Sequence, residues 1–173
     1  MKPIELLLPQ DQINRRVREL ARQITQDYAG ETPVLVGVLK GCIIFISDLM
    51  RHVKLPIELE FAAPTSYKKA VKTEDDISFM GGFSVNMKGR HVLIVEGVVD
   101  SGKTVNLLAS KIQRLEPASV EVVTLLDKPG SHRTKVHLKY IGFSVGNEFV
   151  IGFGLDNTQK YRNLPFIGRL LDT

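Results

Sequence analysis

Apolar residues recur at the spacing of a helix face in two stretches of the chain. These stretches, 11–30 and 103–115, predict amphipathic helices, with Asp11 as the N-cap of the first and Gly30 at its end. A third apolar stretch, 42–50, is long enough for a buried helix. The recurring positions are Ile13, Val17, Leu20 and Ile24 in the first helix, and Val105, Leu108 and Ile112 in the second.

Continuous apolar runs of strand length alternate with these helices. Several are apolar on both faces, which is typical of an open parallel sheet covered by helices and therefore of an α/β fold. Segment 64–79 interrupts the pattern, because it is polar and highly charged, and we expect it to be exposed and mobile. The predicted strands are 34–39, 57–63, 83–87, 91–95, 120–126, 140–143 and 149–153.

The length and composition of the chain limit the number of domains and the kind of protein that it can be. A length of 173 residues with 43% hydrophobic and 24% charged residues fits one globular domain over 1–173. No run approaches the roughly 18 apolar residues of a membrane span, and the polar start lacks the apolar core of a signal peptide. We therefore expect a cytoplasmic protein without a membrane partner. Cys42 is the only cysteine and lies in an apolar run, so it is predicted to be a core residue.

The charge of the chain suits an anionic ligand. The net charge is +4 and the isoelectric point is about 9.2, which fits nucleic acid or a phosphorylated metabolite. Aromatic residues make up only 7% of the chain and are not interleaved with Lys and Arg, unlike a platform that stacks single strands. We therefore do not expect nucleic acid as a partner. The four histidines show no metal-ligand spacing.

Residues 91–104 carry the most informative pattern, in which an apolar strand leads through a glycine turn into a helix. Such a turn presents backbone N–H groups and the positive end of the helix dipole to an anion. Residues 97–104 match G-x-x-x-x-G-K-[ST], the loop that binds nucleotide triphosphates. Glu96, Asp100 and the 101–104 ending also resemble the phosphoribosyl-diphosphate loop of phosphoribosyltransferases. The pattern alone leaves both interpretations open.

The carboxylates favour the second interpretation. A triphosphatase or kinase could use strand 122–127 and its terminal Asp127 to bind magnesium. However, Asp100 would place a negative charge inside a loop that has to hold two or three phosphates. In a phosphoribosyl site, Glu96 would face ribose hydroxyls and Asp100 the base, while 101–104 would hold one monoester phosphate.

Three further segments extend the similarity: Val-Leu-Lys-Gly at 38–41, Leu-Leu-Asp-Lys-Pro at 125–129, and the long stretch 148–165. With them, most of the chain resembles the bacterial hypoxanthine (hypoxanthine-guanine) phosphoribosyltransferases. The resemblance implies a type I phosphoribosyltransferase fold, with a small hood subdomain from the N-terminal and C-terminal segments and a mobile active-site loop at 64–79. It also implies purine salvage, in which hypoxanthine or guanine reacts with phosphoribosyl diphosphate in the presence of Mg²⁺.

The resemblance also implies a role for each matching residue. Asp100 would act as acid/base at N7 of the purine. Lys128 would donate to the 6-oxo group and so select oxo-purines over adenine. Glu96 would meet the ribose hydroxyls and, with Asp156, would lie beside the metal. The other substrate contacts would be Lys40, Gly41 and Arg162 for pyrophosphate, Ser101, Gly102, Lys103 and Thr104 for the 5′-phosphate, Phe149 and Val150 for the base, and Ser66 and Tyr67 on the closing loop.

The chain departs from the family at Gly97, where two adjacent acids are usual. Losing a charged hydrogen bond costs about 1.5 to 3 kcal/mol, so we expect Gly97→Asp to improve the use of phosphoribosyl diphosphate. A second alternative is a non-catalytic phosphoribosyl-diphosphate sensor that binds RNA, although the basic residues are scattered. The expected assembly is a homodimer or homotetramer, and the choice among hypoxanthine, guanine and xanthine stays open.

Overall fold

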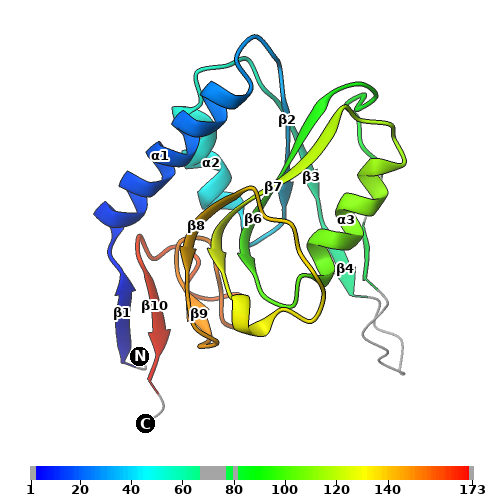
Figure 1. The fold of residues 1–173 in the computed structure, drawn as a ribbon. Coiled ribbons are helices and arrows are strands. Elements are labelled where there is room, and N and C mark those ends of the chain that lie inside the picture. Colours follow the sequence, from blue (N-terminus) through cyan, green and yellow to red (C-terminus); the bar gives the residue numbers. More distant parts are fainter. Residues whose placement is uncertain (1–2, 67–76, 80–81, 172–173) are drawn as a thin grey trace.

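The computed structural model describes residues 3–66, 77–79 and 82–171. Its main layer is a five-stranded sheet with the order β3-β2-β6-β7-β8 (Figure 1). Every neighbouring pair in it is parallel, so the loops that follow these strands leave at one edge of the sheet. The strands are β2 (Val34–Val38), β3 (Glu58–Ala62), β6 (His91–Val99), β7 (Ser119–Asp127) and β8 (Tyr140–Ser144).

Helices cover both faces of this sheet, as Figure 1 shows. Two helices, α1 and α2, pack on one face, and α3 lies on the other. Successive side chains of a strand point to opposite faces; in β2, Leu35 belongs to the core under α1 and α2, whereas Val34 belongs to the core under α3. The predicted α/β fold, a parallel sheet flanked by helices, is therefore confirmed. The helices are α1 (Gln10–Asp27), α2 (Ile43–His52) and α3 (Lys103–Gln113).

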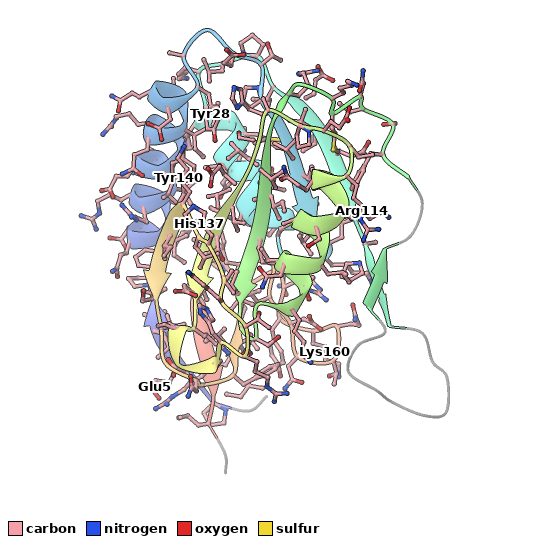
Figure 2. The ribbon with its side chains drawn as sticks, turned by 45° about the vertical axis from the view of Figure 1, so that its right-hand side comes forward. Glu5, Tyr28, Arg114, His137, Tyr140 and Lys160 are labelled. Carbon is pink, nitrogen blue, oxygen red and sulfur yellow. The ribbon has the colours of Figure 1, made fainter. Side chains whose placement is uncertain are left out.

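The edge strand β8 is covered by α1. Arg16 of this helix donates from Nε to the carbonyl of Gly142 at 3.0 Å and from Nη2 to the carbonyl of Ile141 at 2.8 Å. Tyr140 of β8 lies against α1 in Figure 2, and its hydroxyl donates to Asp27 Oδ2 at 2.6 Å. Unpaired strand edges invite pairing with other chains, so these contacts protect the edge and fix α1 in place.

A second, antiparallel sheet joins segments from the two ends of the chain. β1 (Ile4–Leu8) pairs with β10 (Ile167–Leu170), and β10 also pairs with β9 (Val150–Ile151). In Figure 1 the N-terminal and C-terminal segments run side by side below α1. The sequence pattern did not predict β1 or β10 as strands, and it predicted β9 as a longer strand.

The polar segment 64–79 is not a loop at its two ends. β4 (Pro64–Ser66) pairs antiparallel with β5 (Ile77–Phe79), with Thr65 opposite Ser78. The backbone of Ser66 thus belongs to a short strand. Tyr67, predicted to close over the site with Ser66, lies outside the described residues.

Residues 83–87 do not form the predicted strand. Their apolar residues alternate with polar ones, which is the period of a strand, but they pack on the core under α3, and Met87 is 1% exposed. The backbone N–H groups of Ser84 and Val85 donate to Glu60 Oε2 at 2.7 and 3.3 Å. A side-chain acceptor thus satisfies backbone groups that a neighbouring strand would otherwise bind.

Several element ends also differ from the prediction; α1, for example, ends at Asp27 and not at Gly30. Helix α1 begins at Gln10 with Pro9 as its N-cap, so Asp11 lies in the first turn, where its charge still favours the helix dipole. Strand β6 extends to Val99, beyond the predicted end at residue 95. Among the described residues, no helix combines the length and apolar character that crossing a membrane requires.

Candidate active site

Most of the predicted site residues lie at the carboxyl edge of the five-stranded sheet. The loop after β2 contains Lys40 and Gly41, the loop after β6 begins with Asp100, and β7 runs into Lys128. β2 has β3 on one side and β6 on the other, and the helices after β2 and β6 cover opposite faces. The loops therefore diverge between β2 and β6, and open α/β sheets bind ligands at such a switch point.

Residues 101–104 make a tight turn into α3. Gly102 is the N-cap, with a left-handed φ of 81°, and a Cβ at this position would lie 2.2 Å from Val136 Cγ2. Glycine is therefore required on both counts. Ser101 Oγ accepts the N–H of Lys103 at 3.4 Å. The turn directs the first N–H groups of α3 and the positive end of its dipole to the sheet edge, a suitable place for a phosphate.

Asp100 and Lys128 meet beside this turn. Lys128 Nζ lies 3.6 Å from Asp100 Oδ2, with the lysine side chain 6% exposed and the aspartate side chain 60% exposed. The backbone of Lys128 is fixed as well, because its N–H donates to the carbonyl of Val99 at 3.0 Å. A buried cationic donor and an accessible carboxylate thus stand side by side, where a polar heterocycle could contact both.

Lys40 and Arg162 also come together, through Gln159. Gln159 Oε1 accepts hydrogen bonds from Lys40 Nζ and from Arg162 Nη2, both at 3.3 Å. Asp156 holds the same loop, since its Oδ2 accepts the N–H of Gln159 at 2.7 Å and its Oδ1 lies 2.6 Å from Arg162 Nη2. Lys160, from this loop, lies at the same end of the molecule as the loops that follow β6 and β7 (Figure 2). Two cations thus converge on one neutral oxygen.

Glu96 is buried within β6, with 8% of its surface exposed. Burial raises the pKa of its carboxyl to about 8, although the N–H groups of Gly97 and Val98 favour the charged form. The Gly97 N–H lies 2.9 Å from Oε1. The group is therefore largely protonated near neutral pH. These surroundings favour the protonated carboxyl when no cation is bound beside it.

Phe149 and Val150 differ in exposure. Phe149 is 61% exposed, which is unusual for a large apolar residue, whereas Val150 is 5% exposed and pairs with Arg169 of β10. The exposed ring could stack on a flat ligand, and the backbone of Val150 is held in a sheet.

A model of the phosphoribosyl transferase domain matches residues 5–158. The chain belongs to the phosphoribosyl transferase family. It is 39% identical over 170 residues to the hypoxanthine phosphoribosyltransferase of Escherichia coli, covering 97% of this chain and 96% of that protein. It is also 39% identical over 166 residues to a bifunctional protein TilS/HprT of Listeria monocytogenes, covering 96% of this chain but spanning only 26% of that protein.

A solved structure gives the same result. The hypoxanthine-guanine phosphoribosyltransferase of Bacillus anthracis superimposes with a TM-score of 0.92 at 35% identity, over 99% of this chain and 100% of that chain. The predicted type I phosphoribosyltransferase fold and the resemblance to the bacterial hypoxanthine enzymes are therefore confirmed.

The phosphoribosyl transferase fold does not support the triphosphate-loop interpretation of 97–104. That interpretation needs Gly97 to open a loop, but residues 97–99 belong to β6, and Gly97 packs against the backbone of Gly41. Asp127, its expected magnesium ligand, is 5% exposed and lies 2.8 Å from His132 Nε2. The structure and the family therefore give the triphosphate-loop interpretation no support.

The sequence did not single out two residues that hold Arg162: Gln159 Oε1 accepts from its Nη2 at 3.3 Å, and the carbonyl of Gly154 accepts from its Nη1 at 2.7 Å. Gln159 and Gly154 lie within the family-like segment 148–165, so their neighbours Asp156 and Arg162 were the available signal. The site residues Lys40, Gly41, Asp100 and Lys128 do come together as one edge of the sheet.

Proposed function

We propose that this chain transfers the phosphoribosyl group of phosphoribosyl diphosphate to hypoxanthine or guanine, forming IMP or GMP and pyrophosphate in purine salvage. The observation that carries the proposal is the pairing of Asp100 and Lys128 directly beside the 101–104 turn. This arrangement offers one site for a monoester phosphate and, next to it, an acceptor and a cationic donor for an oxo-purine.

The purine would be oriented by three side chains. Asp100 is the accessible carboxylate and takes the proton-handling role at N7. Lys128 donates to the 6-oxo group, and its burial makes the discrimination sharp, because adenine would face the ammonium with an amino group. Phe149 supplies an exposed ring for stacking.

The leaving pyrophosphate would lie between Lys40 and Arg162, with the backbone of Gly41 beside it. Positive charge develops on the sugar as the diphosphate departs, so fixed cations at the leaving group stabilise the transition state. The two cations already converge on Gln159 Oε1, and little reorganisation is needed when phosphate oxygens take that place.

Magnesium fits this site as a companion of the diphosphate. Among residues 3–66, 77–79 and 82–171, no cluster of three or more His, Cys, Asp or Glu side chains could cage a metal. Mg²⁺ commonly binds through one or two carboxylates together with substrate phosphates, and Asp156 is the carboxylate placed for this beside Arg162. When bound, the ion would neutralise charge on the leaving group.

Further features of the family extend the proposal. The β1-β10-β9 sheet would form the hood, because it holds Val150 beside the base site, and segment 64–79, with Ser66 and Tyr67, would close over the substrates. A homodimer or homotetramer and a cytoplasmic location stay predictions. The E. coli and B. anthracis relatives are named as phosphoribosyltransferases, and neither a triphosphatase nor an RNA-binding regulator gains support.

The test is direct. The purified protein is incubated with Mg²⁺, phosphoribosyl diphosphate and one base at a time, namely hypoxanthine, guanine, xanthine or adenine, and the nucleotides are separated by chromatography. We expect IMP or GMP, stoichiometric pyrophosphate and no AMP. A matched reaction with ATP or GTP and no base should release no phosphate.

Two outcomes would contradict the proposal. One is the absence of nucleotide with every base while the protein is folded and binds phosphoribosyl diphosphate. The other is hydrolysis of a nucleotide triphosphate that is lost when Lys103 is changed to Ala.

A further inference from the structure

The carbonyl oxygen of Gly41 lies between β6 and the loop that follows β9. A Cβ atom added to Gly97 would come within 2.7 Å of this oxygen, and one added to Gly154 would come within 2.6 Å of it. Real Cβ atoms essentially never make contacts under 3.0 Å. Two glycines from separate elements therefore leave space for the same backbone oxygen.

The contact at Gly97 is with backbone and not with a movable side chain. The added Cβ would also lie 2.9 Å from the carbonyl carbon of Gly41 and 3.1 Å from Leu155 Cδ2. Leu155 is 6% exposed, so its side chain has little room to withdraw. Any side chain at position 97 would therefore displace the turn itself.

Gly41 is not under the same restriction. A Cβ on Gly41 would meet only Leu155 Cδ2, at an ordinary contact distance of 3.5 Å. The close approach is thus made possible by the glycine on β6. On the other side of the turn, Lys40 Nζ is held by Gln159 Oε1, so the depth of Gly41 and the direction of Lys40 are fixed together.

We propose that Gly97 is a positioning residue, whose missing side chain sets how deeply the Lys40–Gly41 turn sits against β6 and hence where the turn meets the diphosphate. The inference rests on the proposed function and deepens it. It also reverses the expectation from the sequence, because a carboxylate at position 97 would push the turn outward before it could reach a ribose hydroxyl.

The test compares Gly97→Ala and Gly97→Asp with Gly82→Ala, because Gly82 has no atom within 4 Å of an added Cβ. The measured quantities are KM for phosphoribosyl diphosphate, the inhibition constant of pyrophosphate, KM for the purine base, and Tm. Gly97→Ala should raise the first two constants about 10- to 100-fold, as expected for a displaced binding group, and leave KM for the base within about 2-fold. Gly97→Asp should show a loss, and Gly82→Ala no change.

Leu155→Ala provides a second route if Gly97→Ala does not fold. It removes the side chain whose Cδ2 lies beside Gly41 and Gly97, and it should raise KM for phosphoribosyl diphosphate and the inhibition constant of pyrophosphate without adding an atom. The inference is overturned if folded Gly97→Ala binds both diphosphates like wild type, if Gly97→Asp improves catalysis, or if Leu155→Ala leaves both constants unchanged. An inactive wild type would instead overturn the proposed function, and pyrophosphate calorimetry on the variants would still test the positioning.

Discussion

Gln159 Oε1 lies 3.3 Å from the ammonium of Lys40, which precedes it by 119 residues in the chain. The same oxygen accepts from Arg162 Nη2. If this acceptor is removed, Lys40 loses a hydrogen-bond partner, whereas Arg162 keeps its contacts with Asp156 Oδ1 at 2.6 Å and with the carbonyl of Gly154 at 2.7 Å.

We therefore predict that Gln159→Leu raises KM for phosphoribosyl diphosphate by about 3- to 10-fold, the value of one net hydrogen bond, with a smaller effect on kcat. Steady-state kinetics at saturating base measure this split. Gln23→Leu, on the exposed face of α1, is the matched control. An unchanged KM in Gln159→Leu would show that the hydrogen bond from Gln159 does not position Lys40 for the diphosphate.

Asp100→Asn should lower kcat by about 100-fold or more, because a positioned acid/base contributes on that scale. The amide keeps the size of the side chain, so Tm and KM for phosphoribosyl diphosphate should change little. Single-turnover formation of IMP measures the chemical step. Asp48→Asn on α2, which pairs with Arg51 and not with a candidate site residue, should behave as wild type; equal rates for the two variants would exclude Asp100 as the catalytic group.

Lys128→Met should weaken the binding of oxo-purines, since it keeps the length of the side chain and removes the donor. A hydrogen bond from a charged group is worth about 1.5 to 3 kcal/mol, so KM for hypoxanthine should rise about 10- to 100-fold. Use of adenine, which is penalised by the ammonium, should fall less or improve. Lys54→Met, at an exposed position, is the control, and an unchanged preference for hypoxanthine over adenine would argue against Lys128 as the selecting residue.

Glu96 predicts how stability depends on pH. Its pKa is about 8 in the folded protein, against an ordinary value of 4.5, so between these values the folded state keeps a proton that the unfolded state has lost. The free energy of unfolding should therefore fall as pH rises through this window and level off above it. The free energy of unfolding of Glu96→Gln should not fall in this way, because glutamine does not titrate. The difference in this free energy between Glu96→Gln and wild type should therefore shift in favour of the variant by a few kcal/mol from about pH 5 to about pH 8.5.

Urea denaturation of both proteins at the two pH values measures this difference. Glu31→Gln, at an exposed position, should follow wild type. Parallel pH curves for wild type and Glu96→Gln would show that the Glu96 carboxyl is charged throughout, contrary to its burial.

The first helix and the central strands could be predicted from the sequence because they bury complete apolar faces. Ile13, Val17, Leu20 and Ile24 fix α1, and the runs in β2, β6 and β7 fix the centre of the parallel sheet. Strands β1 and β10 were not predicted, because their pairing depends on a partner at the other end of the chain. Residues 83–87 were predicted wrongly as a strand, since the period of their apolar residues does not reveal that Glu60 binds the backbone.

The candidate site, too, could be predicted only in part from the sequence. Asp100, Lys128 and the 101–104 turn stand in recognisable local patterns, and the structure brings them together. The buried state of Glu96 and the space requirement at Gly97 depend on what packs against β6, which residue types at those positions do not disclose. The bridge through Gln159 joins loops from distant parts of the sequence and could be found only in three dimensions.

The pairing of β1 with β10, and of β10 with Val150 in β9, also has a consequence during biosynthesis. A ribosome makes β1 long before β10, so β1 stays unpaired while the five strands of the parallel sheet are made. The edge that holds Val150 is completed only when β10 emerges. A nascent chain with its parallel sheet already assembled would therefore still lack the strand that holds Val150 in place.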